Sequence, residues 1–276
     1  MNTVIRAMRI EVETLRKSPA LWLEPNFEAR VEAIDALEFN SLDEARVLAQ
    51  ELEDLNQKLF RNLRAKLRPG TDVREMIQTH ITMPLKNPHD EEGYDNLDLF
   101  LNGLFSMGPI PAETNESDPE MVFYQKTPGR VILDMVDKAG FTGDDVFYDL
   151  GSGLGQVPLL VNLLSGVRAK GVEIEPAYVR YSEQSATALG IQNVTFVEAD
   201  VRAAGLSDGT VFFLYTPFTG GMLEEVLGKL QKESEQRVIR VFTYGPCTLD
   251  ISQKTWLRSD SPIDPNPHRL AAFKSL

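Results

Sequence analysis

The stretch VFYDLGSGLGQ, residues 146–156, decides the fold. It begins with a short apolar run, Val146 to Leu150, rich in β-forming residues, which predicts a buried parallel strand. Three glycines follow, and the next segment, VPLLVNLLSG, has the composition of a helix. A strand, a glycine turn and a helix in this order bring backbone N–H groups close to a ligand at the carboxyl edge of a sheet.

The spacing of the glycines indicates which ligand. The dinucleotide fingerprint is G-x-G-x-x-G, whereas here Gly151, Gly153 and Gly155 alternate with other residues, and Asp149 stands two residues before the first of them. A carboxylate at that place repels a pyrophosphate but suits a cation. S-adenosylmethionine (SAM) has an ammonium group and a sulfonium and no phosphate, so the loop favours SAM over NAD. A glycine turn that binds no ligand is the alternative.

Two further acids follow the next two predicted strands. RAKGVEIEP predicts a strand that ends at Glu173, about twenty residues beyond the glycines, where nucleotide-binding α/β folds place an acid on the ribose hydroxyls. Glu175 is the alternative acid, and we favour Glu173 because it directly follows Val172, the last apolar residue of that strand. NVTFVEAD predicts a third strand, and Asp200 after it would accept a hydrogen bond from an adenine amino group. Solvated surface charges are the alternative for these acids.

Length and charge limit the kind of partner. A chain of 276 residues with 42% hydrophobic residues holds one large domain, or a domain and an appendage, and is not wholly disordered. The net charge is −13, and no basic stripe with interleaved aromatic residues is present, so we expect no strong nucleic-acid binding. A basic protein or a small molecule is the easier partner for an acidic chain.

The cysteine and the histidines predict neither a disulfide nor a metal site. Cys247 is the one cysteine, which excludes an intrachain disulfide and a cysteine-built zinc site, and we expect a buried thiol. His80 and His89 match no ligand spacing, so we expect surface histidines and no metal.

No targeting or membrane segment is predicted. The N-terminal segment carries Glu11 and Glu13 and no long apolar core, so we expect neither a signal peptide nor a transit peptide. No run reaches the roughly 18 apolar residues of a membrane span. We therefore expect a soluble, cytoplasmic protein.

Residues 1–115 predict a helical N-terminal subdomain. Ser41 and Glu44 form a capping box, and leucines then recur every three or four residues from Leu48 to Leu67 until Pro69 and Gly70 end the helix. This leucine stripe is either the packed face of the subdomain, which we favour, or the seam of a homodimer. Further helices are expected over residues 2–17, 26–38, 71–78 and 97–105. The loop PIPAETNESDPE, residues 109–120, marks the junction with a second domain over 116–276.

The rest of residues 116–276 completes an α/β pattern. VFYQKTP leads into an amphipathic helix over residues 129–140; it either folds over the glycine loop, with Tyr124 and Thr127 facing the ligand, or is a simple connecting loop. A fourth strand, Val211 to Tyr215, ends in Thr216-Pro217-Phe218. A helix over 222–233, a strand over 237–244 and an antiparallel pair over 254–258 and 268–274 follow. We predict an α/β fold with a doubly wound, mostly parallel, seven-stranded Rossmann-like sheet.

The motifs VFYDLGSGLGQ, GVEIEP, VEAD and LYTPF resemble the ordered motifs of class I SAM-dependent methyltransferases over residues 121–276. A closer resemblance is to the non-SET histone lysine methyltransferases, the disruptor-of-telomeric-silencing family: DLGSGLGQV is nearly its glycine-loop signature, GVE and Tyr181 fit its second motif, and FYQKT is similar to its substrate-and-cofactor loop. Lys126 stands where the family carries an acid, LYTPF replaces an asparagine-containing segment, and the basic DNA-binding tail is absent.

This resemblance implies a set of site residues. SAM would be held by Tyr124, Thr127, Asp149, Gly151, Ser152, Gly153, Gln156, Glu173, Ile174, Asp200, Val201 and Tyr215. The catalytic set would be Tyr124, Tyr215, Pro217 and Phe218, because YTPF is similar to a degenerate proline-aromatic motif of amino-group methyltransferases. Our hypothesis is that the three aromatic residues wall the methyl-transfer channel; for Phe218, a place in the core is the alternative.

We therefore expect a SAM-dependent methyltransferase that N-methylates a protein side chain of lysine type and releases S-adenosylhomocysteine (SAH). One alternative is a methyltransferase for a small molecule or RNA. Another is a non-catalytic SAM-binding module in which the helical front recruits a partner. An NAD oxidoreductase is disfavoured by the glycine spacing and by Asp149.

Overall fold

The computed structural model describes residues 42–67, 71–81, 93–105, 108–114, 119–259 and 261–276. The chain divides into two compact units, one made of residues 1–86 and 94–106, the other of 87–93 and 107–276. The helices expected over 2–17 and 26–38 lie outside the described residues, as do Ser41 of the capping box and His89. The loop predicted over residues 109–120 belongs to the second unit in its described parts, 108–114 and 119–120. The predicted domain boundary at residue 115 stays a prediction.

The described part of the first unit is helical. Its helices are α3 (Leu42–Lys66), α4 (Val73–His80) and α5 (Asn96–Phe105). The apolar stripe of α3 ends in the core of this unit: Leu63 and Leu67 are buried, and the Phe60 ring lies 5.7 Å from that of Phe100 on α5. Helix α4 begins at Val73, two residues later than expected, because the Asp72 side chain caps it by accepting from the N–H of Glu75.

The second unit is the α/β fold that the sequence predicts. Its strands are β1 (Val146–Leu150), β2 (Arg168–Glu173), β3 (Val194–Glu198), β4 (Val211–Tyr215), β5 (Arg240–Tyr244), β6 (Leu257–Arg258) and β7 (Ala271–Ser275). They form one seven-stranded sheet in the order β3-β2-β1-β4-β5-β7-β6. Strands β1 to β5 pair in parallel, and β7 runs antiparallel to both β5 and β6.

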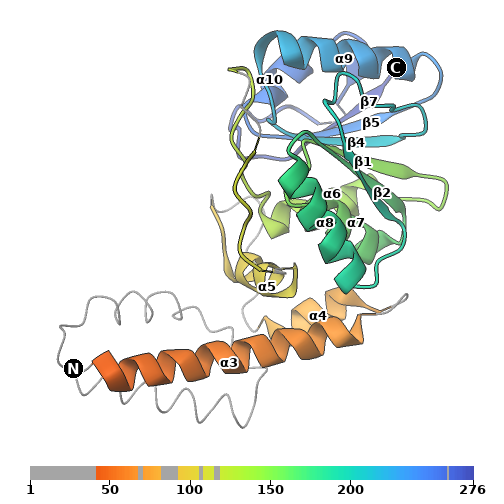
Figure 1. The fold of residues 1–276 in the computed structure, drawn as a ribbon. Coiled ribbons are helices and arrows are strands. Elements are labelled where there is room, and N and C mark those ends of the chain that lie inside the picture. The colour runs from red at the N-terminus through yellow and green to blue at the C-terminus, as the bar shows by residue number, and fades with distance from the viewer. Residues whose placement is uncertain (1–41, 68–70, 82–92, 106–107, 115–118, 260) are drawn as a thin grey trace. The chain divides into compact units, whose positions relative to one another are not determined.

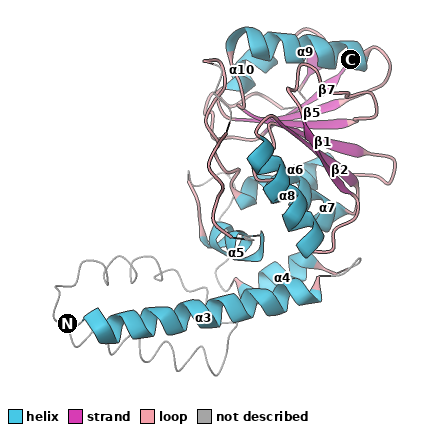
Figure 2. Ribbon diagram, in the orientation of Figure 1, coloured by secondary structure: helices cyan, strands magenta, loops and turns pink. Residues whose placement is uncertain are grey.

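Helices cover both faces of the sheet, as Figures 1 and 2 show. They are α6 (Gly129–Ala139), α7 (Gln156–Ser165), α8 (Pro176–Ala188), α9 (Gly220–Ser234) and α10 (Cys247–Ser252). The first three lie on one face, and α9 and α10 lie on the other. Strand β1 is buried at all five positions, since it lies mid-sheet between two layers of helices; this explains its unbroken apolar run.

Several details of the second unit differ from the sequence prediction; helix α9, for example, begins at residue 220 rather than 222. Strand β5 begins at residue 240 rather than 237, because Arg237 ends the preceding turn, where its side chain donates to the carbonyl of Gly209 and to Glu233. Strand β6 is two residues long instead of five, and β7 begins at residue 271 instead of 268. Helix α10 was not predicted; its six residues are too few to show a period. Cys247, at its start, is buried as expected.

Two findings concern the described residues as a whole. No helix within them has the length and apolar composition needed to cross a membrane. Within the same ranges, no group of three His, Cys, Asp or Glu side chains is placed to hold a metal ion. The His80 ring packs on Phe100, with its Nδ1 2.8 Å from the carbonyl oxygen of Met76.

Candidate functional site

A cavity of about 750 Å³ lies at the carboxyl ends of the central strands. This volume is that of a small-molecule site, and the place is the one where open α/β sheets bind ligands. Every site residue predicted from the sequence lines this cavity: Tyr124, Thr127, Asp149, Gly151, Ser152, Gly153, Gln156, Glu173, Ile174, Asp200, Val201, Tyr215, Pro217 and Phe218. The structure thus brings together residues spread over almost a hundred positions; their individual roles stay predictions.

The glycine loop passes close to other parts of the cavity wall. The N–H groups of Gly151 and Ser152 both donate to the carbonyl of Val172, at 2.9 and 3.0 Å, which ties the turn to β2. A Cβ on Gly153 would lie 2.2 Å from the Tyr124 ring, and one on Gly151 would lie 2.4 Å from Pro217. Because both glycines also have positive φ, no other residue fits either position without moving these neighbours.

Glu173 is held by backbone donors. Its two carboxylate oxygens accept from the N–H of Gly153 at 2.7 Å and from that of Glu175 at 2.9 Å. Burial raises the pKa of Glu173, and the backbone hydrogen bonds oppose that rise. The carboxylate is therefore fixed beside the glycine loop, and lone pairs remain on both oxygens for a ribose diol.

Glu175, the alternative acid, is engaged in the fold. It caps α8 by accepting from the N–H of Ala177 at 2.9 Å. It also accepts from both the N–H and the hydroxyl of Thr114, at 2.8 and 2.6 Å, and so holds the preceding loop against α8. These contacts support the preference for Glu173 as the residue that binds the ligand.

Asp149 is the most deeply buried acid of the cavity. It is only 3% exposed, and burial raises its pKa well above the ordinary value, with the nearby Glu173 raising it further. A buried pair of carboxylates is unfavourable by itself, and a cation placed between them relieves both the desolvation and the repulsion.

Asp200 has a strong partner of its own. Its carboxylate accepts hydrogen bonds from Nε of Arg202 and, at 2.6 Å, from a terminal guanidinium nitrogen of the same residue. The hydrogen bonds from Arg202 hold the pKa of Asp200 below its ordinary value, so it is ionised. An adenine amino group bound here would share the carboxylate with Arg202.

Residues 119–127, which we call the strap, cross the cavity between the glycine loop and the end of β4. Met121 forms an antiparallel bridge with Phe218, and the N–H of Val122 donates to the carbonyl of Pro217 at 3.1 Å. Glu120 caps α9 from a distance, accepting from the N–H groups of Gly221 and Met222 at 2.9 and 2.7 Å. The strap is thus the cavity wall on this side and not a simple connecting loop.

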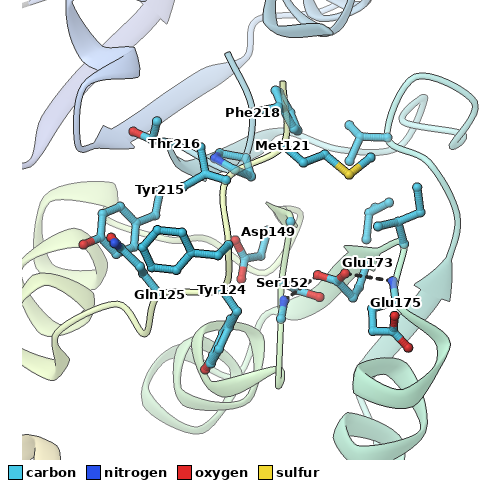
Figure 3. A pocket seen from close by; sticks show the side chains of 18 of the residues that line it. Met121, Tyr124, Gln125, Asp149, Ser152, Glu173, Glu175, Tyr215, Thr216 and Phe218 are labelled. Atoms are coloured by element: carbon cyan, nitrogen blue, oxygen red, sulfur yellow. Dashed lines mark hydrogen bonds between the residues drawn. The ribbon is translucent and has the colours of Figure 1, made fainter. Parts of the chain in front are cut away.

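These contacts place Tyr124 against the glycine loop. Its ring meets the edge of Tyr178 on α8, with centroids 5.5 Å apart. In Figure 3, Asp149 and Tyr124 lie between Glu173 and Glu175 on one side of the cavity and Tyr215 and Thr216 on the other.

The end of β4 carries an unusual backbone conformation. Thr216 is the one residue other than glycine with positive φ (38°) in the described chain, and it precedes a proline. Its hydroxyl donates to the carbonyl of Tyr244 and accepts from the N–H of Cys247, both at 3.2 Å, so the turn is anchored to β5 and α10. The following Phe218 lines the cavity, is 4% exposed and belongs to the hydrophobic core. Its place in the core is therefore confirmed, and its role in the methyl-transfer channel stays a prediction.

The charge of the lining decides which ligand fits. Among the described residues that line the cavity are five carboxylates and no lysine or arginine; Lys126 is not part of the lining. In addition, Ser152 Oγ and Gln156 Nε2 are buried and have no hydrogen-bond partner within the described structure. A cationic ligand with its own donors and acceptors, such as SAM, suits both the carboxylates and these two groups. A pyrophosphate could accept from the two groups but would be repelled by the carboxylates.

Sequence reasoning missed several lining residues. They include Glu113, Tyr178, Gly245, Pro246 and His268. Gly245 and Pro246 directly follow β5, and the rule that ligands bind at the carboxyl ends of parallel strands would have found them. Tyr178 and His268 come from a helix and a proline-rich loop, and no local sequence signal marks either.

Residues 120–198 match the family model described as histone methylation protein DOT1. The match covers the strap, the glycine loop and the acids of β1 and β2, and it confirms the predicted resemblance to SAM-dependent methyltransferases close to that family. A search of curated protein sequences finds no match.

Solved structures similar to the chain include three methyltransferases. The RNA methyltransferase from Salinibacter ruber, in complex with SAH, is 24% identical, covers 55% of this chain and 92% of its own, and gives a TM-score of 0.43. The precorrin-6y C5,15-methyltransferase from Geobacter metallireducens is 19% identical; the match covers 56% of this chain and 92% of that protein, with a TM-score of 0.43. The ribosomal protein L11 methylase from Lactobacillus delbrueckii subsp. bulgaricus is 15% identical over 57% and 81%, with a TM-score of 0.41. Their acceptors differ.

Proposed function

We propose, from the premise that the α/β unit is a SAM-dependent methyltransferase, that it N-methylates a protein side chain of lysine type. The observation that carries this proposal is the charge pattern of the cavity: carboxylates lie at the ends of β1, β2 and β3, and among the described lining residues none lies at the ends of β4 and β5, where Tyr215 and His268 are found. The first part of the cavity suits a cationic cofactor and the second an amine. The choice of a protein as acceptor is supported by the match of residues 120–198 to the histone methylation family model.

The cofactor would lie along the ends of β3, β2 and β1. Asp200 would accept from the adenine amino group, Glu173 from the ribose hydroxyls, and Asp149 would face the cationic part of the methionine moiety. Gln156 would donate to its carboxylate through the side-chain amide that lacks a partner. When bound, SAM supplies an activated methyl group and a neutral leaving group.

The protein's part in the reaction is alignment. The glycine loop and the strap hold the cofactor side, and Thr216-Pro217 fixes the turn beside it, so the acceptor nitrogen can be held in line with the methyl group. Tyr124 and Tyr215 would stabilise the positive charge that develops on the nitrogen through their ring faces, by about 0.5–2 kcal/mol each. Phe218 would contribute from the core side of the cavity.

The experiment that tests this proposal is transfer of labelled methyl from SAM to a cell extract, followed by digestion. Label that is lost with protease and recovered as methyl-lysine after acid hydrolysis is the expected result. Label that survives protease but is lost with ribonuclease, or that stays in the small-molecule fraction, would identify an RNA or a metabolite as the acceptor instead. Tight SAM binding without any transfer would identify a non-catalytic module.

Two variants serve as controls in that experiment. Asp149→Asn should lower the incorporation of label at sub-saturating SAM, whereas Lys126→Ala should retain it, because Lys126 does not line the cavity. A cytoplasmic location and a homodimer through the N-terminal helices stay predictions from the sequence.

A further inference from the structure

The cavity continues along the sheet edge beyond the cofactor residues. In sheet order, its lining follows β3, β2, β1, β4 and β5. Five adjacent strands are four inter-strand spacings wide, or roughly 19 Å. The acids proposed to bind the cofactor, Asp200, Glu173 and Asp149, occupy the β3, β2 and β1 part, which leaves the ends of β4 and β5, beside Tyr215, for a second ligand.

The two ends of the cavity differ in chemistry. The carboxylates among the described lining residues lie at the carboxyl ends of β1, β2 and β3, apart from Glu113, which accepts a hydrogen bond from Tyr178 on α8 at 2.9 Å. The described lining at the ends of β4 and β5 includes Tyr215, Thr216, Gly245 and Pro246, together with His268 from the loop before β7. At that end, His268 is the one described lining residue with an imidazole, a side chain that can accept a hydrogen bond and act as a general base.

His268 is held in place by its loop. The Asn266 side chain accepts from the N–H of His268 at 2.8 Å, and the Asp264 side chain accepts from the N–H of Asn266 at 2.8 Å. The N–H of Gly245 donates to the carbonyl of Pro267 at 2.8 Å, which ties the loop to the end of β5. The imidazole therefore has a fixed backbone beneath it.

Aromatic contacts place the imidazole on the acceptor side. Its ring lies 6.1 Å from the Tyr244 ring, which in turn lies 4.8 Å from the Tyr215 ring. The groups around it that carry or can take charge are these two phenols, from β5 and β4, and Asp264 and Arg269 of its own loop, which form an ion pair at 3.8 Å.

We infer that His268 binds the methyl acceptor, accepting a hydrogen bond from its N–H group and taking up the proton that the nitrogen sheds. This inference rests on the proposed function. A lysine ammonium is not a nucleophile until it loses a proton, and an end of the cavity without carboxylates favours its neutral form. As the nitrogen–carbon bond to the methyl group forms, the carbon–sulfur bond breaks and its electron pair stays on sulfur. The proton passes from the nitrogen to the imidazole and then to water.

A first experiment tests binding without turnover. Protein loaded with SAH is titrated with n-butylamine, which represents a lysine side chain, while the histidine ring protons are followed by NMR. The chain has three histidines, and the signal missing in His268→Gln assigns the third. We expect a saturable shift confined to the His268 signal. A His268 signal that does not respond to the amine would overturn the inference.

A second experiment separates this inference from the proposed function. Transfer of labelled methyl to extract is compared for the wild type, His268→Gln and the control His80→Gln, with SAM affinity measured by calorimetry. His268→Gln should keep SAM affinity and lower transfer by roughly 100-fold, as for loss of a general base, and His80→Gln should match the wild type. Undiminished transfer would refute the role of His268. If the label proves to be in RNA and His268→Gln still lowers its incorporation, the proposal of a protein acceptor is wrong, but the proposed role of His268 is supported.

Discussion

At the scale of single residues, Asp149 connects stability with cofactor binding. Its pKa is raised in the folded protein, so its protonated form contributes stability that is present below the unfolded pKa of about 3.9 and is lost as the pH rises through the folded pKa. Asn cannot ionise. Without SAM, the thermal stability of Asp149→Asn should therefore equal that of the wild type at low pH and exceed it progressively as the pH rises. Thermal unfolding measured over that pH range tests this.

The same substitution should weaken SAM. Loss of the carboxylate should cost at least about tenfold in affinity, or about 1.4 kcal/mol, so at equal concentration SAM should raise the melting temperature of Asp149→Asn less than that of the wild type. For the wild type, SAM affinity should rise with pH, because the bound cation favours the ionised carboxylate. Asp144→Asn, on the exposed turn before β1, is the control that should change neither quantity. If Asp149→Asn is less stable than the wild type at high pH, the pKa of Asp149 is not raised in the folded protein.

Thr216 allows a test of backbone strain. A β-branched residue at a φ of 38° is strained by about 1–3 kcal/mol, and its two hydroxyl hydrogen bonds offset part of this. Thr216→Val keeps the strain and removes the hydrogen bonds, so it should destabilise by roughly 1–3 kcal/mol. Thr216→Gly relieves the strain and should cost less. Urea unfolding of both variants measures the order, and Val ranking above Gly would argue against strain at this turn.

Single residues also show where sequence reasoning stops. The acids of the cofactor side were found because each one lies at or just after the carboxyl end of a strand, a position that a one-dimensional pattern reveals. His268 and Tyr178 were not found, because nothing local separates a histidine before β7, or a tyrosine on α8, from surface residues of the same type. Glu173 and Glu175 differ only in their partners, which are distant in sequence.

At the scale of elements, the glycine loop and the strap fit against each other. Gly153→Ala would force its methyl group against the Tyr124 ring and should reduce SAM affinity by about tenfold or more. Gly166, at the other end of α7, also has positive φ, but a Cβ there has no neighbour within 4 Å. Gly166→Ala should therefore cost about 1 kcal/mol of stability and leave SAM affinity unchanged. Calorimetry on the pair decides, and equal losses of affinity would mean that backbone strain alone matters.

The strap depends on Glu120, which caps α9. Glu120→Ala leaves two N–H groups of the first turn without their acceptor and should cost about 1–2 kcal/mol of stability. SAM affinity should fall as well, because the strap carries Tyr124. Glu224 on the same helix forms a surface ion pair with Lys254, and Glu224→Ala should cost at most about 1 kcal/mol and leave SAM affinity unchanged. Wild-type SAM affinity in Glu120→Ala would show that the strap is held without this cap.

The elements themselves were the most predictable part of the chain. Strands β1 and β4 were located from continuous apolar runs, which are typical of parallel strands buried on both faces. Strands β2 and β3 were located from shorter apolar stretches with an acid at or near their end. The boundaries of β5, β6 and β7 were less exact. Their ends are set by pairing across the sheet, as where the N–H of Ile239 donates to the hydroxyl of Ser275, and pairing between distant segments leaves no mark in the local sequence.

At the scale of the whole molecule, the two units should respond differently to the cofactor. The cavity is lined by residues 113–268 of the second unit only, as far as the described structure extends. In hydrogen exchange followed by mass spectrometry, SAM should therefore slow exchange in the strap, the glycine loop and the start of α8. It should leave helix α3 unchanged. Protection of α3 by SAM would mean that the helical unit takes part in binding.

The position of β7 in the sheet has a consequence for how the protein is made. Strand β7, residues 271–275, lies between β5 and β6, and it supplies the antiparallel partner of β5. During synthesis, strands β1 to β5 and all described residues of the cavity lining leave the ribosome before this strand does. Until residue 275 has emerged, β5 has an open edge, and an open edge invites pairing with another chain. The nascent protein thus passes through a stage in which the residues of its ligand site have all been synthesised but its sheet still lacks β7. A chaperone would be of most use at this stage.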